Sequence, residues 1–160
     1  MPVDSDLLRQ VMGRFATGVT VVTTRHGEEI SGMTANAVTS LSLDPPLILV
    51  CVGLEGSMHG LLKEGKCFAV NILRADQQEL STRFAKFGPK DFSGVELTSA
   101  ETGAPIFKEA LAYADCEVVD VVRGGDHDIF IGQMLTGATV DGEPLIFYGG
   151  QYANLATGDN

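Results

Sequence analysis

The sequence predicts a mainly β protein with a few helices, folded as an antiparallel barrel. Short segments rich in β-branched and aliphatic residues recur along the chain, and hairpin turn signals separate several of them. Only two or three helical patterns intervene, whereas a doubly wound parallel sheet would alternate strands with helices. With 160 residues the chain is long enough for one domain with a sizeable core, and we expect residues 1–160 to form that domain.

The composition narrows the class of protein. Hydrophobic residues make up 44% and charged residues 20%, which is ordinary for a soluble globular chain. The 21 acidic and 11 basic residues give a net charge of −10, which argues against a nucleic-acid partner or an anionic membrane. No apolar run approaches the ~20 residues that span a bilayer, and no signal-peptide pattern is present, so we expect a cytoplasmic protein.

The three cysteines indicate a reducing compartment. Cys51, Cys67 and Cys116 lie in apolar, strand-like segments and show no Cys-x-x-Cys spacing. We therefore expect buried, reduced thiols rather than a disulfide or a metal site.

The first helical pattern covers residues 4–14. Its apolar residues form one stripe, and Asp4 or Ser5 can cap its N-terminus. A strand is expected over residues 19–24, and the polar residues 26–29 then predict a hairpin turn.

The segment 34–42 has the β-branched and hydroxyl residues of a strand, together with side chains too small to fill a core. Two interpretations stay open: a polar strand exposed to solvent, or a strand against whose backbone a flat ligand lies. The aliphatic run 47–52 follows Pro45-Pro46 and precedes Gly53, which predicts a strand buried on both faces.

A short helix is predicted over residues 57–64, with Ser57 as its N-cap. Its N-terminus is either a phosphate site or simply a capped surface end. A strand over 67–73 and a helix over 76–84 follow. On that second helix we expect Leu80 and Phe84 to face the barrel.

The segment 86–109 contains too many Gly and Pro breaks for regular structure, and so long a loop is usually functional or mobile. Strands are then predicted over 111–123 and 128–135, joined by a turn at Gly124-Gly125. A further hairpin is expected at Asp141-Gly142, before a last strand over 144–148.

Several chemistries lack their motifs. Neither Gly-x-G-x-x-Gly nor a phosphate-binding loop occurs, which disfavours a Rossmann site or a nucleotidase. The histidines at 26, 59 and 127 are too scattered for a metal cluster, so we expect no metal. Asp126-His127-Asp128 could belong to a catalytic triad, but no serine or cysteine lies in a nucleophile-elbow motif, which disfavours hydrolysis.

Four segments together resemble one known family. They are Phe15–Thr23, Ser31–Pro46, Phe68–Leu73 and Gly125–Gly132, within a likeness that spans about residues 8–155. In this order they resemble the flavin reductase-like family of FMN-binding split barrels. Many of its members are the reductase component of two-component flavin-dependent monooxygenases.

The resemblance implies a function. An NADH- or NADPH-dependent reductase would transfer hydride to FMN or FAD and supply the reduced flavin to a partner monooxygenase. The alternative is a split-barrel redox module that keeps its FMN bound; a β-barrel interaction domain without flavin is a third possibility. The resemblance also implies a homodimer with the flavin near the interface.

The resemblance further assigns site residues. The flavin is expected to contact Met33, Thr34, Ala35, Asn36, Ser40, Cys51, Val52, Ser57, Met58, His59 and Phe84. Residues 34–36 would hydrogen-bond the ring edge, Cys51 and Val52 would lie beside the ring, and Ser40 with residues 57–59 would surround the ribityl phosphate. The nicotinamide is expected at His127, the catalytic candidate, together with Tyr148 and Tyr152. In the other interpretation His127 is an ordinary surface residue.

Overall fold

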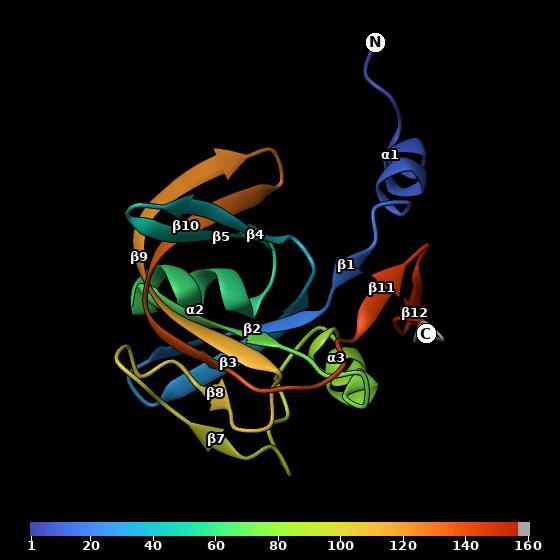
Figure 1. Ribbon diagram of the computed structural model, residues 1–160. Coiled ribbons are helices and arrows are strands. Elements are labelled where there is room, and N and C mark those ends of the chain that lie inside the picture. The colour runs from blue at the N-terminus through green and yellow to red at the C-terminus, as the bar shows by residue number, and fades with distance from the viewer. Residues whose placement is uncertain (157–160) are drawn as a thin grey trace.

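The computed structural model describes residues 1–156, and its elements are arranged as Figure 1 shows. In chain order they are α1 (Ser5–Met12), β1 (Thr17–Gly18), β2 (Thr20–His26), β3 (Glu29–Ala35), β4 (Val38–Leu43), β5 (Pro46–Gly53), α2 (Ser57–Gly65), β6 (Cys67–Ile72), α3 (Gln78–Phe84), β7 (Leu97–Thr98), β8 (Ile106–Phe107), β9 (Ala112–Gly124), β10 (His127–Thr139), β11 (Ile146–Tyr148) and β12 (Gln151–Ala153).

The main sheet has seven strands in the order β3-β2-β6-β9-β10-β5-β4, and every ladder in it is antiparallel. It curves around α2, and within the described residues no ladder joins its edge strands β3 and β4 (Figure 1). The predicted antiparallel split barrel is therefore confirmed. A small sheet of β1, β11 and β12 lies beside the barrel.

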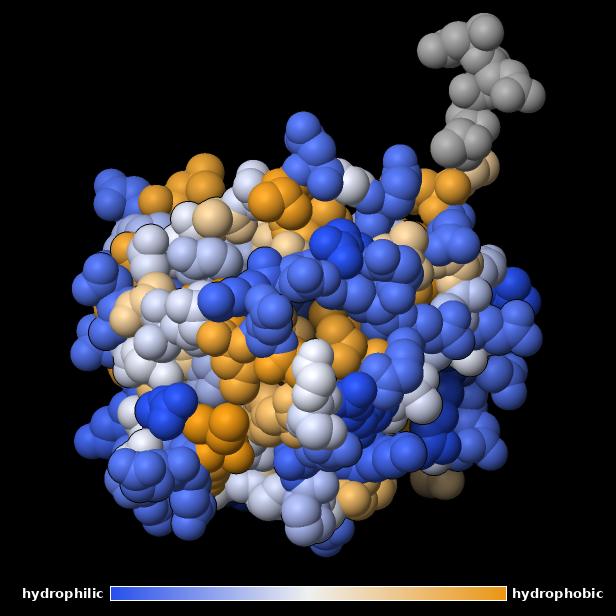
Figure 2. Space-filling model, turned by 90° about the horizontal axis from the view of Figure 1, so that it is seen from below, coloured by the Kyte–Doolittle hydropathy of each residue, from blue (hydrophilic) through white to orange (hydrophobic). Residues whose placement is uncertain are grey.

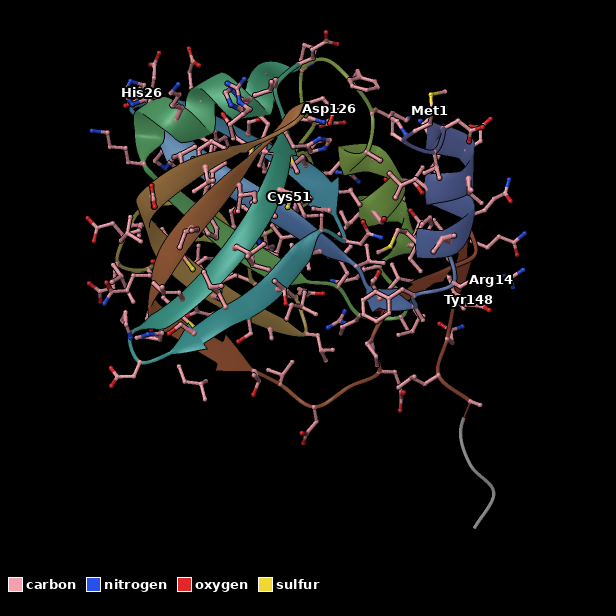
Figure 3. All side chains as sticks on the ribbon, turned by 90° about the horizontal axis from the view of Figure 1, so that it is seen from above. Met1, Arg14, His26, Cys51, Asp126 and Tyr148 are labelled. Carbon is pink, nitrogen blue, oxygen red and sulfur yellow. The ribbon has the colours of Figure 1, made fainter. Side chains whose placement is uncertain are left out.

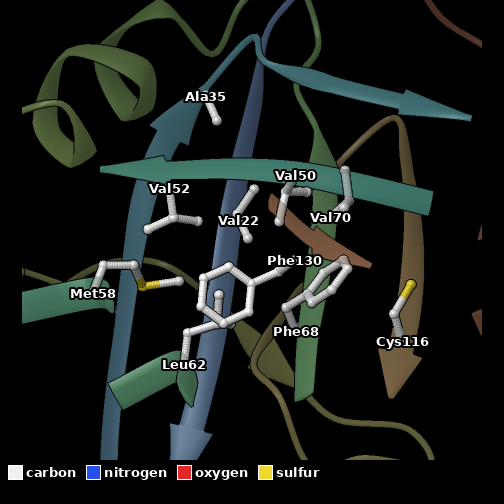
Figure 4. Packing of buried hydrophobic residues seen from close by; sticks show 10 residues of the cluster. All are labelled: Val22, Ala35, Val50, Val52, Met58, Leu62, Phe68, Val70, Cys116 and Phe130. Atoms are coloured by element: carbon white, nitrogen blue, oxygen red, sulfur yellow. The ribbon is translucent and has the colours of Figure 1, made fainter. Parts of the chain in front are cut away.

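The main core lies between the curved sheet and α2. Phe68 and Phe130 are fully buried there, and α2 contributes Met58 and Leu62 (Figure 4). Each such side chain contributes roughly 1.5–3 kcal/mol through burial, so the helix and the sheet hold each other in place.

A second cluster covers the outer side of β2 and β3. Phe84 of α3 is 1% exposed and packs against Phe92 and Phe107 from the segment 86–109. The ring reaches β3 because Gly32 has no side chain: a Cβ there would lie 3.2 Å from Phe84 Cδ1. Seen from below, apolar residues show in the middle of a mostly polar surface (Figure 2).

Local predictions near the N-terminus hold. Asp4 caps α1, since its Oδ1 accepts from Leu7 N–H at 2.8 Å. The β2–β3 hairpin turns where predicted, between His26 and Glu29, and Gly27 takes a φ of 60° that favours glycine.

The prediction of one strand over 34–42 is wrong. β3 ends at Ala35, the chain bends at Asn36 and Ala37, and β4 begins at Val38. The bend crosses the open edge of the barrel, because β3 and β4 lie at opposite ends of the sheet order.

β5 is not buried on both faces. Val50 and Val52 point into the core, whereas Leu47, Leu49 and Cys51 are half-buried on the other face. Cys67 and Cys116 are buried as expected, and all three thiols are free. One face of β5 stays half-buried because β5 lies next to the edge strand β4 and the main core packs against its other face only.

Two further details differ from expectation. Gly56, with φ 114°, precedes α2 as its N-cap, so Ser57 is the first helical residue and makes no side-chain cap. After Gly142 the chain forms no hairpin with β10. β11 instead pairs with β1 and β12, because the chain leaves the main sheet after Thr139.

Candidate functional site

A cleft of about 990 Å³ opens beside β4 and β5. Its wall is formed by the end of α1, by β1, β4 and β5, and by the adjoining ends of β6, β9 and β10. No charged residue occurs among the described residues that line it, and most of its surface is apolar. Its polar groups belong to Thr17, Thr20, Asn36, Thr39, Ser40, Ser42, Tyr113 and Thr139. This size and character suit a large, flat, mostly apolar ligand.

Three of the predicted flavin residues line this cleft. Asn36 lies at the bend between β3 and β4, and Ser40 lies in β4. Cys51 lies in β5 (Figure 3). Cys51 N–H donates to Ala37 O at 3.0 Å, which holds the bend against β5. The break in the strand therefore exposes Asn36 at one edge of the cleft.

Thr17 supplies an unsatisfied polar group. Its Oγ1 is buried and, within residues 1–156, has no hydrogen-bond partner. A buried hydroxyl without a partner is costly, and a polar ligand atom in the cleft can satisfy it. This orphaned hydroxyl and the apolar walls both fit a flavin, whose ring system has apolar faces and a polar edge.

Sequence reasoning missed Thr17, Tyr113 and Thr139 as lining residues. Thr17 lies within the segment 15–23 that carried the resemblance, so its hydroxyl could have been identified from the sequence as a candidate flavin contact. Nothing in the sequence marks Tyr113 or Thr139, since only the β9–β10 ladder brings them to the cleft.

Other predicted residues lie where β3 and β5 end and α2 and β10 begin. The side chains of Ala35, Val52 and Met58 are buried there in the main core (Figure 4). They can present only backbone atoms to a ligand. Met33 is half-buried against the same core, and Ser57 is exposed at the start of α2.

His59 is engaged within the protein. Its Nε2 lies 2.6 Å from Asp128 Oδ2, and Arg123 Nε donates to Asp128 Oδ1 at 2.7 Å. The hydrogen bonds from His59 and Arg123 lower the pKa of Asp128 below its usual value. The His59 ring nitrogen expected at a phosphate is thus held by a carboxylate.

His127 begins β10 opposite Gly53, the last residue of β5. Its side chain is 48% exposed, and its Nδ1 lies 2.7 Å from Asp126 Oδ1. That hydrogen bond lowers the pKa of Asp126. The ring therefore stands at the surface beside the end of β5 and is accessible to a ligand.

Tyr148 and Tyr152 do not gather around His127. Tyr148 OH accepts from Arg14 Nη1 at 3.4 Å, and Figure 3 shows this pair well away from Asp126, the neighbour of His127. Tyr152 OH lies 2.6 Å from Ser81 Oγ in α3.

Thr34 and Phe84 also make contacts within the protein. Thr34 Oγ1 donates to Ser81 O at 2.5 Å, which joins β3 to α3. Phe84 is buried in the second cluster and lines no part of the cleft. The prediction that the segment 86–109 has no regular structure is wrong, because β7 and β8 pair there as a short antiparallel ladder. The segment packs on the second cluster and contributes nothing to the cleft.

Two kinds of site or segment are not found among residues 1–156. Their histidine, cysteine and acidic side chains form no group that could hold a metal ion. No helix among them has the length and apolar character required to cross a membrane.

Known proteins resemble this chain over nearly all of its length. An NADH-dependent FAD reductase of Streptomyces globisporus is 41% identical over 97% of this chain and 88% of its own. The reductase component of a 4-nitrophenol 4-monooxygenase/4-nitrocatechol 2-monooxygenase of Rhodococcus opacus is 39% identical over 96% of this chain and 83% of its own.

Solved structures agree with these relatives. The NADH:FAD oxidoreductase SgcE6 of Streptomyces globisporus superposes with a TM-score of 0.92 at 41% identity, covering 98% of this chain and 96% of that one. The same oxidoreductase in complex with NAD and FAD fragments gives a TM-score of 0.90 at 40% identity, over 98% and 97% of the two chains. Residues 12–156 match the sequence profile of the flavin reductase like domain. The chain therefore belongs to the flavin reductase like family.

Proposed function

We propose that this protein is an NADH-dependent flavin reductase that supplies reduced FMN or FAD to a partner monooxygenase. The observation that carries the proposal is the open, uncharged cleft lined by Asn36, Ser40 and Cys51, of which Asn36 and Ser40 lie in the segment 31–46 that resembles the family. The relatives are an NADH-dependent FAD reductase and a monooxygenase reductase component, which supports this activity over a module that keeps its flavin.

When bound, the flavin and the nicotinamide would supply the hydride-transfer chemistry. The chain's own residues bind and orient. The apolar walls would exclude water from a bound ring, and Thr17 and Asn36 would offer it polar atoms. No acid–base pair is required of the protein, and none lines the cleft among the described residues.

The nicotinamide is proposed to lie at His127. Its half-exposed ring stands beside Gly53, where β5 ends, and Cys51 of the cleft lies two residues earlier in that strand. A donor ring held at His127 would therefore adjoin the end of the cleft. His127 acts here by contact and orientation, because hydride transfer needs no proton at this residue.

The protein is also proposed to form a homodimer. α1 buries none of its residues, and its stripe of Leu7, Leu8, Val11 and Met12 continues to the exposed Phe15. α1 stands away from the barrel in Figure 1. Met12 and Phe15 also line the cleft, so a second copy covering this stripe would close the flavin site. Light scattering should give twice the monomer mass, and a stable monomer at micromolar concentration would refute the dimer.

The proposed compartment is the cytoplasm. All three cysteines of this single flavin reductase-like domain are free thiols, which is the state expected where glutathione keeps cysteines reduced.

The test uses protein purified without added flavin. We expect it to oxidise NADH only when FMN or FAD is supplied. Asn36→Ala should raise the flavin concentration at half-maximal rate about threefold to tenfold, which corresponds to one lost hydrogen bond. Thr82→Ala, on the exposed face of α3, is the matched control and should change nothing. A yellow protein that retains its flavin through turnover would favour the redox module instead.

A further inference from the structure

A buried carboxylate lies directly after His127. Asp128 is 4% exposed, yet it carries two charge-assisted hydrogen bonds, from Arg123 Nε at 2.7 Å and with His59 Nε2 at 2.6 Å. An ionised carboxyl costs free energy to bury unless such partners hold it. An apolar residue would fill this inward position of β10 without that cost, as Phe130 does two residues later.

The two partners come from different elements. Arg123 lies directly opposite Asp128 in the β9–β10 ladder. His59 is the third residue of α2, and its ring packs edge-on against Phe130 at 5.7 Å between centroids. The carboxylate thus ties the tip of the β9–β10 hairpin to the first turn of α2. Figure 3 shows Asp126 at that tip, close to one end of α2.

The same tip carries His127. Side chains alternate along a strand, so Asp128 points inward while His127 points outward. A Cβ built on Gly53 would lie 3.9 Å from His127 Nε2, which places the ring over the end of β5. Leu54 N–H also donates to Asp126 O at 3.0 Å. Where the His127 ring stands therefore depends on how the hairpin tip is held.

We propose that Asp128 is a positioning residue that acts through His127, by locking the hairpin tip to α2 through His59 and Arg123. This inference rests on the proposed function, in which His127 meets the nicotinamide. Asp128→Asn keeps the size of the side chain but removes its charge. It also presents an amide N–H₂ in place of one carboxylate oxygen, so neither bond is made to an anion and His59 Nε2 can keep its bond only as an acceptor.

The first test reads the position of His127 without any turnover. Imidazole ¹H–¹⁵N NMR spectra of the flavin-free protein contain only His26, His59 and His127. Asp128→Asn should shift the His127 and His59 signals and leave His26, which lies near Glu64 at the other end of α2, unchanged. Asp115→Asn is the matched control. It alters another buried carboxyl, which bonds Thr102, and should leave His127 unmoved. Unchanged His127 signals in Asp128→Asn would overturn the proposal.

The second test is a double-mutant cycle on NADH kinetics. Asp128→Asn should raise the half-saturating NADH concentration about tenfold when His127 is present, since ring placement is lost. In the His127→Ala background it should raise that concentration less than about twofold, because the two residues act as a unit. An equal rise in both backgrounds would show that Asp128 does not act through His127.

The experiments distinguish a failure of the proposed function from a failure of the proposed role of Asp128. If the unaltered protein oxidises no NADH with either flavin, the proposed function fails, while the imidazole spectra still decide the role of Asp128. If Asp128→Asn does not fold, Arg123→Gln and His59→Gln each weaken one of the two bonds. Each should then shift His127 in the same direction, and two unshifted spectra would refute the proposal.

Discussion

Gly132 provides the sharpest test of the packing that supports the site. It lies in β10, within the segment 125–132 that carries the family likeness, and its neighbours leave no room for a side chain. A Cβ at this position would lie 2.5 Å from Phe68 Cζ and 2.8 Å from Cys116 Cβ. Carbon atoms in contact need about 3.5 Å, so the ring would have to move by about 1 Å.

The surrounding core leaves no space into which the Phe68 ring could move. Phe68 and Cys116 are both fully buried in the main core. Overpacking of this kind costs about 1–3 kcal/mol, and a chain of this length loses about 2–4 °C in Tm per kcal/mol. Gly132→Ala should therefore lower the Tm by about 2–12 °C. Gly60 is the matched control, because nothing lies within 4 Å of a Cβ there and it is exposed in α2.

Calorimetry and urea unfolding measure both variants. Gly60→Ala should stabilise the protein by about 0.5–1 kcal/mol, since alanine loses less backbone entropy than glycine in a helix. Adding Phe68→Leu to Gly132→Ala should relieve the clash, so the double variant should be more stable than the sum of the single effects predicts. A Gly132→Ala protein as stable as its parent, with no coupling to Phe68, would refute the packing argument.

Three further predictions follow from single contacts. In the native protein a disulfide reagent should react with Cys51 alone, because Cys67 is buried and burial raises the pKa of the Cys116 thiol to about 12. FMN should protect Cys51, which lines the cleft. Equal labelling with and without FMN would place the ring elsewhere. The pKa of Asp128 is lower in the folded than in the unfolded state, so the stability it contributes is present above about pH 4 and is lost as the pH falls through the folded value. The stability difference between the parent and Asp128→Asn should thus shrink on acidification, and a difference that stays constant would contradict this. Tyr152→Phe removes the bond to Ser81 and should cost about 0.5–1.5 kcal/mol with unchanged NADH dependence; a raised half-saturating NADH concentration would instead place its hydroxyl at the nicotinamide.

Local signals in the sequence were sufficient for several of the elements. Asp4 or Ser5 ahead of an apolar stripe predicted the capped α1, and the polar residues 26–29 predicted the β2–β3 turn, because caps and tight turns depend on a few adjacent residues. The antiparallel barrel followed from the spacing of the strands and turns. The family resemblance came from four short segments and their order along the chain, both of which can be read from the sequence.

Tertiary structure alone decided which surfaces these elements share. The aliphatic run of β5 shows that the strand is apolar, but only the sheet order shows that one of its faces lines the cleft. Thr17 and Tyr113 both line the cleft although they are 96 positions apart in the chain. His59 pairs with Asp128 rather than standing free for a phosphate, because α2 docks inside the barrel next to the β9–β10 tip. The periodicity of a strand or helix shows which of its side chains lie on the same face. Only the packed tertiary structure determines which other residues that face contacts.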